Sequence, residues 1–271
     1  MGFLDGKVAL ITGAARGQGR SHAIVLAEEG ADVILVDICG PVSADVEYPP
    51  AARAELDEVV REVAGRGRRA LPHVLDIRDF AALDRAVRES AAALGGLDIV
   101  LANAGFVSWH RFWEMPAETW QAMMEVTLTG TFNTLKAAAP IMIAQGRGGS
   151  IVITSSAAGL KALPGQLHYT TAKHGLVGLT KGAALELGPF GIRVNSLHPY
   201  VVDTRMGSRT ERMIRLIEEN PSYADSLGRV LADPPSLTCD DVSRAVLYLL
   251  SPSARLVTGH QLRLDSGQTI V

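Results

Sequence analysis

The chain has 271 residues, of which 47% are hydrophobic and 20% charged, and its formal net charge at pH 7 is −3. This length fits one large α/β domain or two small ones, and the lack of a basic excess argues against nucleic-acid binding. Cys39 and Cys239 are too few for a disulfide framework, so we expect a reducing compartment, the cytoplasm. No apolar run reaches the roughly 18 residues of a membrane span, and the first residues lead directly into a strand. We therefore expect neither a membrane segment nor a signal peptide.

Short apolar runs alternate with amphipathic segments along the chain. In order, we predict strand Lys7–Thr12, helix Gly17–Glu29, strand Asp32–Asp37, helix Arg53–Ala64, strand Ala70–Asp76, helix Phe80–Leu94, strand Leu97–Ala102, helix Ala117–Ala144, strand Ser150–Ser155, helix His168–Leu187, strand Ile192–Leu197, helix Asp240–Leu250 and strand Gln261–Leu264. Repeated strand–helix units are typical of a doubly wound parallel sheet with helices on both faces. We expect an α/β Rossmann fold formed by a single domain over residues 1–271.

Two stretches interrupt this alternation, the Pro-rich segment 38–52 and the polar segment 203–237. Irregular segments of this length in a compact domain are usually functional lids or disordered. We expect an insertion at 38–52, for which a tolerated surface loop is the alternative, and a substrate lid at 203–237.

A glycine-rich turn follows the first strand, with Gly13, Gly17 and Gly19 in the stretch Thr12-Gly13-Ala14-Ala15-Arg16-Gly17-Gln18-Gly19. Such glycines let the backbone approach a pyrophosphate at the positive end of the following helix. The alternative is a turn without a ligand, but the second strand ends in Asp37, where a carboxylate can accept both ribose hydroxyls and repel a 2′-phosphate. Arg16 could pair with a phosphate, but we expect Asp37 to decide the choice in favour of NAD over NADP.

Tyr169 and Lys173 are spaced i and i+4, which places them on one face of a helix, about one turn apart. An ammonium beside a phenol stabilises the phenolate, which otherwise forms only near pH 10. Ser156, on a separate segment, could hydrogen-bond the substrate oxygen that Tyr169 protonates or deprotonates. The alternative is a packed Tyr beside a solvated Lys.

The chain resembles the short-chain dehydrogenase/reductase family over essentially its whole length. The resemblance is carried by the glycine turn, Asn103-Ala104-Gly105, the Ser156, Tyr169 and Lys173 set, Arg193-Val194-Asn195, and Pro199. The segments Thr12–Ala23 and Val36–Cys39 are similar to a mycofactocin-associated subgroup that includes carveol dehydrogenases. That similarity implies a tightly held cofactor, trapped by the insertion and reoxidised in place by an external redox carrier.

The resemblance also implies a role for individual residues. The glycine turn with Arg16 and Gln18 would cradle the cofactor phosphates and ribose, with Tyr169 as acid/base, Lys173 binding the nicotinamide ribose and lowering the Tyr pKa, and Ser156 orienting the substrate oxygen. The remaining cofactor contacts would be Asp37 and Ile38 at the adenosine ribose, Asp76 and Ile77 at the adenine, Asn103, Ala104 and Gly105 at the floor, and Pro199, Val202 and Thr204 at the nicotinamide. For Asp76, Asn103 and Asn195, capping of strand ends is the alternative.

Two positions depart from the family pattern. Thr127 stands where the family usually carries an Asn that organises a water relay from the Lys to solvent. A Thr hydroxyl can bond back to a helix carbonyl, so we expect a slower or rearranged relay. Tyr200 follows Pro199 where Gly is common, and we expect its ring to narrow the substrate pocket, with surface packing as the alternative.

Aromatic and aliphatic side chains after the fourth, fifth and sixth strands would form the substrate wall. We expect Trp109, Leu163, Tyr200 and Met206 to contact substrate, and further candidates are Phe106, His110, Phe112, Trp113, Leu160, His168 and residues 213–217. This lining favours a small apolar alcohol or ketone. The histidines lack companions at metal-ligand spacing, so we expect no metal site.

Other functions remain open. The alternatives are a reductase of 3-oxoacyl thioesters, which would prefer NADPH, and an NAD-binding sensor with weakened catalysis. By family resemblance, we expect a homotetramer formed through the helices at Ala117–Ala144 and His168–Leu187.

Overall fold

The computed structural model describes residues 2–271. Its strands are β1 (Val8–Thr12), β2 (Asp32–Asp37), β3 (Ala70–Val74), β4 (Ile99–Ala102), β5 (Gly149–Thr154), β6 (Ile192–Pro199) and β7 (Gln261–Leu264). Its α-helices are α1 (Gly17–Glu28), α2 (Arg53–Ala64), α3 (Phe80–Leu94), α4 (Ala117–Met123), α5 (Gly130–Gln145), α6 (Leu167–Leu187), α7 (Glu211–Glu219) and α8 (Cys239–Leu250).

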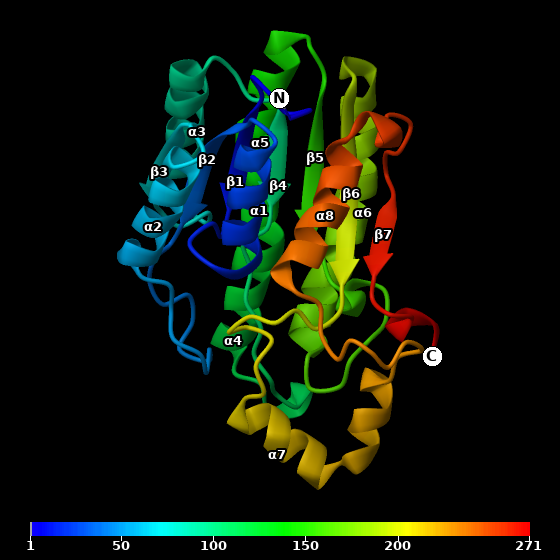
Figure 1. Cartoon of the computed structure of the whole chain (residues 1–271). Coiled ribbons are helices and arrows are strands. Elements are labelled where there is room, and N and C mark those ends of the chain that lie inside the picture. The colour runs from blue at the N-terminus through cyan, green and yellow to red at the C-terminus, as the bar shows by residue number, and fades with distance from the viewer. Residues whose placement is uncertain (1) are drawn as a thin grey trace.

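The seven strands form one parallel sheet in the order β3-β2-β1-β4-β5-β6-β7 (Figure 1). Strand β1 pairs with β2 on one side and β4 on the other, so the chain crosses over at this point. In such sheets the crevice beyond the carboxyl ends of the strands, at the crossover, is where ligands bind. The predicted doubly wound parallel sheet is confirmed.

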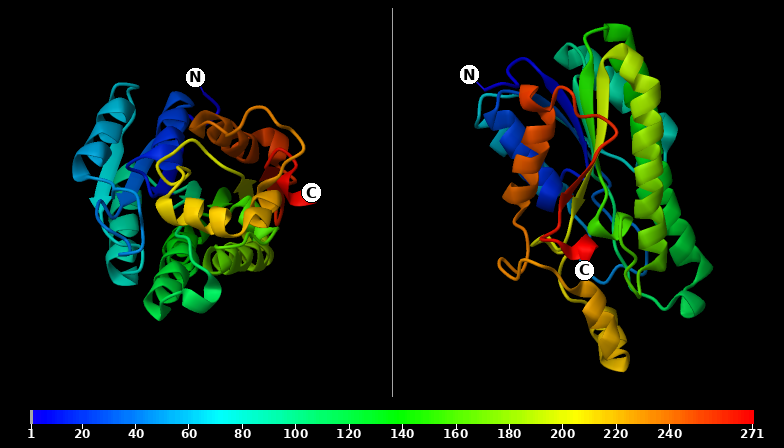
Figure 2. Two further views of the ribbon diagram at one scale, coloured as in Figure 1. Left: turned by 90° about the horizontal axis from the view of Figure 1, so that it is seen from below. Right: turned by 90° about the vertical axis from the view of Figure 1, so that its right-hand side faces the viewer.

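Helices cover both faces of the sheet, as the edge-on view in Figure 2 shows. Successive strand residues point to opposite faces, so Ile11 and Leu35 enter the core beneath α1, α2 and α8, while Leu10 and Ile34 enter the core beneath α3, α5 and α6. Burial on both faces explains why the central strands are apolar throughout.

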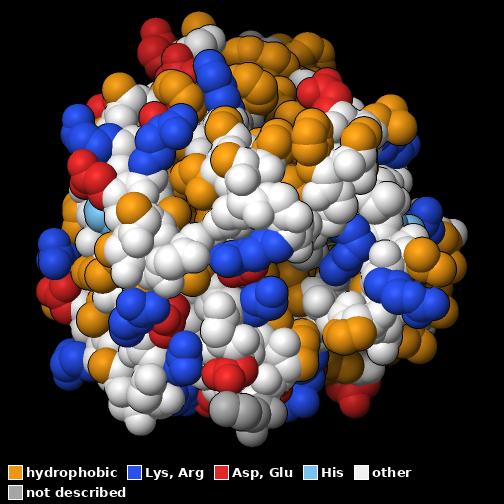
Figure 3. All heavy atoms as spheres, turned by 90° about the horizontal axis from the view of Figure 1, so that it is seen from above, with side chains coloured by type: hydrophobic (Ala, Val, Ile, Leu, Met, Phe, Trp, Pro, Cys, Tyr) orange, Lys and Arg blue, Asp and Glu red, His pale blue; other side chains and the backbone are white. Residues whose placement is uncertain are grey.

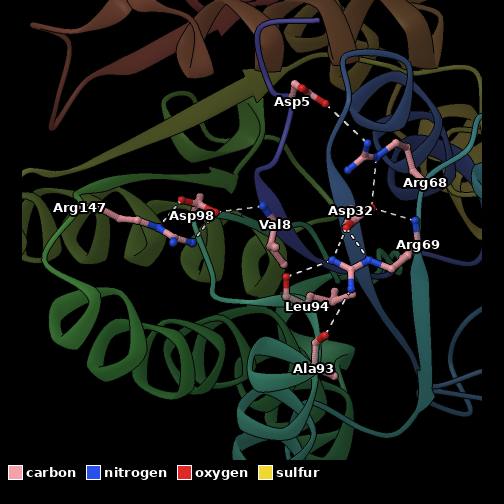
Figure 4. Close-up of polar contacts among 9 residues, drawn as sticks. All are labelled: Asp5, Val8, Asp32, Arg68, Arg69, Ala93, Leu94, Asp98 and Arg147. Carbon is pink, nitrogen blue, oxygen red and sulfur yellow. Dashed lines mark hydrogen bonds and ion pairs between the residues drawn. The ribbon is translucent and has the colours of Figure 1, made fainter. Parts of the chain in front are cut away.

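Ion pairs hold together the amino-terminal end of the sheet (Figure 4). Asp98 accepts hydrogen bonds from the Val8 backbone N–H at 3.0 Å and from Arg147 Nε at 2.9 Å. Asp32, which is only 4% exposed, is bound by Arg68 and Arg69. Viewed from this end, the surface mixes charged side chains of both signs with apolar ones (Figure 3). At the end opposite the crevice, Asp98 thus joins β1 to the start of β4, and Asp32 joins β2 to the residues before β3.

The strand and helix boundaries lie within two residues of the predicted ones. The differences arise because a strand ends where its hydrogen-bonded pairing stops, and an apolar run need not stop at the same residue. The long helix predicted at Ala117–Ala144 is divided by a π-helical segment at Met124–Thr129. The Thr131 and Thr134 hydroxyls donate to the carbonyls of Thr127 and Gly130, both at 2.8 Å, along this widened turn. An apolar period of 3.6 residues does not signal such a local widening.

The two irregular segments lie at the carboxyl end of the sheet. Residues 38–52 form neither helix nor strand, whereas the predicted lid contains α7 and the 3₁₀ segment Pro221–Leu227. A parallel bridge between Val202 and Leu237 joins the two ends of the lid. Helix α7 crosses beneath the ends of the strands (Figures 1 and 2).

Candidate active site

A cavity of about 930 Å³ opens at the carboxyl ends of the strands, at the crossover between β1 and β4. It receives side chains from the glycine turn, the insertion, the ends of β2 to β6 and the lid. Apart from Gly19, the assigned cofactor residues line it, as do Ser156 and the four expected substrate contacts. These are Gly13, Arg16, Gly17, Gln18, Asp37, Ile38, Asp76, Ile77, Asn103, Ala104, Gly105, Trp109, Ser156, Leu163, Tyr169, Lys173, Pro199, Tyr200, Val202, Thr204 and Met206. The predicted catalytic Thr127 is not among the cavity-lining residues.

The glycine turn requires its glycines for two physical reasons. Gly13 and Gly17 have φ angles of 69° and 57°, in the left-handed region that other residues rarely adopt. A Cβ on Gly19 would lie 2.0 Å from the Gly13 carbonyl oxygen, so α1 could not pack against the turn. Gly19 therefore does not line the cavity but allows α1 to pack against the turn. That packing keeps the backbone of the turn close to the cavity.

Two buried polar atoms beside this turn have no hydrogen-bond partner within residues 2–271, Arg16 Nη1 and Gln18 Oε1. They lie at the start of α1, whose first turn carries no acidic residue. Exposed backbone N–H groups at a helix amino terminus, together with a guanidinium, attract phosphate oxygens. The residues present therefore fit the pyrophosphate of a dinucleotide.

Asp37 is oriented by two backbone N–H groups, those of Ala15 on Oδ2 at 3.0 Å and Cys39 on Oδ1 at 2.9 Å. The residue is buried at the cavity wall. Each carboxylate oxygen can accept more than one hydrogen bond, so both retain acceptor capacity toward the cavity. This arrangement fits a ribose with two free hydroxyls.

The residues predicted beside the adenine form one side of the cavity. Asp76 is held by Arg78, whose Nε donates to Asp76 Oδ2 at 2.8 Å. Ile77 is buried against α5, since Asn133 donates to its carbonyl at 3.0 Å and a Cβ on Gly130 would lie 2.5 Å from Ile77 Cδ1. The Ile77 side chain supplies an apolar wall suited to a flat base.

Capping of strand ends, the alternative role for these asparagines, is seen for Asn103, whereas Asn195 lies within β6. Asn103 Nδ2 donates to the Thr12 carbonyl at 3.1 Å, and Thr154 donates to Asn103 Oδ1 at 3.3 Å, so Asn103 connects the ends of β1, β4 and β5. Asn195 instead joins β6 to the segment before β7, through Val257 and His260, and does not line the cavity.

Ser156, Tyr169 and Lys173 meet in this cavity from two elements. Lys173 Nζ lies 5.5 Å from the centroid of the Tyr169 ring and donates to the Thr154 carbonyl at 2.7 Å. Burial raises the pKa of the Tyr169 phenol, and a hydrogen bond with Ser156 opposes that effect. We expected Lys173 to lower the Tyr169 pKa, but the lowering contact in this structure is Ser156. Burial lowers the pKa of Lys173 itself to about 7, because a desolvated ammonium is costly.

Thr127 is fully buried, in the π-helical segment. Its hydroxyl donates to Met123 Sδ at 3.3 Å and not to a helix carbonyl, so that part of the prediction is wrong. The Thr127 carbonyl accepts from the Thr131 hydroxyl at 2.8 Å. The acceptor is the sulfur of Met123, one helical turn earlier. Residue spacing alone does not show whether a Thr hydroxyl bonds to a side chain or to a helix carbonyl. A Cβ on Gly105 would lie 3.8 Å from both Thr127 Oγ1 and Lys173 Nζ, so both side chains end beside Gly105.

The predicted substrate contacts divide between the cavity and the surface. Tyr200 lines the cavity with little exposure, and its hydroxyl donates to the Pro234 carbonyl at 2.7 Å. Phe112 and Trp113 are more than half exposed and do not line the cavity. They stack edge-to-face on each other in the loop before α4. The remaining candidates outside the cavity are His110, Leu160, His168 and residues 214–217, whereas Phe106 and Met213 line it.

The insertion contacts the lid across the cavity mouth. Asp45 Oδ1 accepts from Arg212 Nη1 of α7 at 3.0 Å, and Glu47 accepts from the Arg212 backbone N–H at 3.2 Å. Asp45 also accepts from the Thr119 hydroxyl of α4. The pairing joins three segments that are far apart in the sequence.

The sequence did not single out Tyr48, Gln166 or Gln268, which also line the cavity. The Tyr48 hydroxyl accepts from the Val107 N–H at 3.4 Å, and its ring lies 5.9 Å from the Arg16 guanidinium. Gln166 could have been found from its spacing of three residues before Tyr169. No sequence pattern indicates Gln268, because its position in the cavity depends on the path of the chain after β7.

Within residues 2–271, no three His, Cys, Asp or Glu side chains gather closely enough to hold a metal ion. Among the same residues, no helix has the length and apolar character needed to cross a membrane.

Comparison with known proteins identifies the family. A family model described as enoyl-(acyl carrier protein) reductase matches residues 13–269. An uncharacterized NAD-dependent oxidoreductase of Mycobacterium tuberculosis is 49% identical over 98% of this chain and 97% of its own length. The (−)-trans-carveol dehydrogenase of Rhodococcus erythropolis is 47% identical over the full length of both chains. A crystal structure of a short chain dehydrogenase from Mycobacterium paratuberculosis bound to NAD covers 100% of both chains with 44% identity and a TM-score of 0.97. The chain therefore belongs to the short-chain dehydrogenase/reductase family.

Proposed function

We propose that this protein is an NAD-dependent oxidoreductase that interconverts an apolar secondary alcohol and its ketone. The observation that carries the proposal is the meeting of Ser156, Tyr169 and Lys173 in one cavity with a glycine turn. The names of the M. tuberculosis and R. erythropolis relatives and the NAD-bound M. paratuberculosis structure support the cofactor and the substrate class.

The glycine turn with Arg16 and Gln18 binds the pyrophosphate, and Asp37 accepts the adenosine ribose hydroxyls. Bound NAD supplies the chemistry by accepting the hydride of the alcohol carbon. The remaining cofactor contacts that we assign are Ile38, Asp76, Ile77, Asn103, Ala104, Gly105, Pro199, Val202 and Thr204, all of which line the cavity.

Three side chains act on the substrate oxygen or its proton. The Ser156 hydroxyl hydrogen-bonds that oxygen, and the Tyr169 phenolate takes the hydroxyl proton. Lys173 binds the nicotinamide ribose, and its pKa of about 7 lets it exchange a proton near neutral pH. Trp109, Leu163, Tyr200 and Met206 enclose the apolar part of the substrate.

The insertion keeps the cofactor bound between turnovers, and an external redox carrier of the mycofactocin type reoxidises it in place. The hydrogen bonds between Asp45 and Arg212 support this part of the proposal, because they close the insertion onto the lid. A homotetramer formed through α4–α5 and α6 accounts for large apolar side chains exposed on those helices, such as Phe132 at 47% and Leu185 at 80%.

The test is Tyr169→Phe, assayed with NAD and an apolar cyclic secondary alcohol such as carveol. NADH formation should fall by about 10³-fold, because the general base is lost, while NAD affinity stays within about twofold. Tyr248→Phe on the exposed face of α8 makes the same chemical change far from the cavity and should leave turnover unaltered. Turnover that survives in Tyr169→Phe would sink the assignment.

Mass spectrometry of the gently purified protein tests cofactor retention separately. Copurified NAD(H) that resists dialysis supports retention, whereas release on dialysis with normal turnover on added NAD contradicts it. Binding of NAD without turnover of any alcohol would favour the sensor alternative.

A further inference from the structure

Two buried glutamines, Gln166 and Gln268, line the cavity. They are 6% and 4% exposed. No hydrogen bond joins either side-chain amide to another residue of the described range 2–271. Their backbone groups, by contrast, are bonded, since Thr170 N–H donates to the Gln166 carbonyl at 2.8 Å and Gln268 N–H donates to the Asp265 carbonyl at 2.9 Å.

Gln166 lies at the start of the helix that carries the reacting side chains. It is the residue immediately before α6, three positions before Tyr169 and seven before Lys173. Its backbone is not helical, with φ −130° and ψ 35°. Gln166 lines the same cavity as Tyr169 and Lys173.

Gln268 is brought to the same region by a rigid turn near the carboxyl end of the chain. Asp265 accepts from the N–H groups of Gly267 and Thr269, both at 3.0 Å, and Gly267 has a φ of 81°. Lys161, in the loop between Ser156 and Gln166, donates from Nζ to the Gln268 carbonyl at 3.1 Å. The turn and this contact hold Gln268 beside the loop that carries Leu163.

The polar groups that Gln166 and Gln268 present to the cavity are uncharged amides. Among the cations that line the cavity, Arg229 has its guanidinium directed to the carbonyls of Leu231 at 3.0 Å and Ala232 at 2.7 Å. An amide that a ligand covers without offering a hydrogen-bond partner costs on the order of 1–3 kcal/mol, so a ligand that lacks a matching group is penalised. Amides donate and accept, which suits a hydroxyl or carbonyl oxygen.

We propose that Gln166 and Gln268 form a second polar subsite, and that the natural substrate is an apolar secondary alcohol carrying a second, uncharged oxygen away from the reacting carbon. This proposal rests on the proposed function and narrows its substrate class. Both glutamines are specificity-determining residues, and neither takes part in proton transfer.

The test compares the affinities of the NAD-saturated protein for two ketones, 4-methylcyclohexanone and cyclohexane-1,4-dione. The two differ at one ring position. The oxidised cofactor cannot reduce them, so calorimetry measures affinity without turnover. The wild type should bind the dione about tenfold more tightly, the value of one matched hydrogen bond. Gln166→Leu and Gln268→Leu should each reduce this preference, and the double variant should abolish it, while affinity for the methyl ketone stays within about threefold.

Leu163→Met is the matched control, because it alters the apolar wall at nearly constant volume and should change both affinities equally. Equal affinities in the wild type, binding of neither ketone, or an undiminished preference in the double variant would each overturn the proposal. NADH consumption with the same ketones is measured separately. A dione preference without NADH consumption would count against the oxidoreductase assignment and leave the subsite standing.

Discussion

Lys173 Nζ donates a hydrogen bond of 2.7 Å to the carbonyl of Thr154, and this contact joins α6 to the end of β5. Ser156 lies two residues beyond Thr154, and Tyr169 lies one turn before Lys173. The contact therefore holds the segment that carries Ser156 against the helix that carries Tyr169. Because Ser156 lowers the Tyr169 pKa, its removal has a predictable effect on the pH dependence of turnover.

Ser156→Ala should move the ascending, acidic limb of the pH–rate profile for alcohol oxidation to higher pH. Oxidation requires the phenolate, so its rate rises as pH rises toward the Tyr169 pKa, and the variant loses the hydrogen bond that lowers this pKa. We also expect kcat/KM to fall by about 10²-fold, through loss of the bond to the substrate oxygen. An unshifted profile would show that Ser156 does not set the phenol pKa.

Asp37→Ala should weaken NAD binding by about 10- to 100-fold, because the ribose hydroxyls lose charged acceptors worth about 1.5–3 kcal/mol. The change also leaves the N–H groups of Ala15 and Cys39 without their acceptor. Calorimetric titration measures the effect, with Asp57→Ala on the exposed side of α2 as the control. An unchanged affinity in Asp37→Ala would refute the ribose assignment.

Arg212→Ala should accelerate release of NAD, because it breaks the bond between the lid and Asp45 of the insertion. We expect an increase of about fivefold, since a partly exposed ion pair contributes up to about 1 kcal/mol. Stopped-flow fluorescence of bound NADH measures the rate. Arg244→Ala removes an ion pair of similar length, to Asp240 in α8, away from the cavity mouth. Equal release rates in both variants would contradict a closing role for the insertion.

Asp32→Asn should destabilise the fold by about 3 kcal/mol at neutral pH, because a buried carboxylate is removed from two arginines. Burial raises the Asp32 pKa, but hydrogen bonds and charge from Arg69 and Arg68 lower it more, so it lies below its ordinary value. The Asp32 contribution is thus present above about pH 4 and is lost as pH falls through the depressed pKa. Urea unfolding of both proteins at several pH values should show their difference shrinking in acid. A constant difference would exclude this linkage.

Thr127→Asn tests the weakened proton relay. If Thr127 slows proton exchange between Lys173 and solvent, an Asn at this position should raise turnover about threefold, with its solvent isotope effect reduced. The variant must retain the wild-type melting temperature, because Thr127 is fully buried against Met123. Turnover that falls or stays the same in a stably folded variant would argue against a weakened relay.

Much of the fold and the cofactor half of the site could be predicted from local pattern. The turn from Gly13 to Gly19 and the carboxylate at Asp37 act through backbone geometry within one βαβ unit, which neighbouring residues specify. The spacing of Tyr169 and Lys173 placed both on one face of α6 for the same reason.

The sequence by itself predicted the alternation of strands and helices, the dinucleotide turn and the candidate Ser156, Tyr169 and Lys173 set, since each follows from short-range periodicity or residue spacing. Only the tertiary structure decided which side chains close the cavity. It directed the Thr127 hydroxyl to Met123, set Asp45 against Arg212, and brought Gln268 beside the Leu163 loop. Some of these contacts join segments far apart in the chain, which no sequence periodicity relates. In the others, a hydroxyl has several acceptors within reach, and the packing of the folded chain decides which one it bonds.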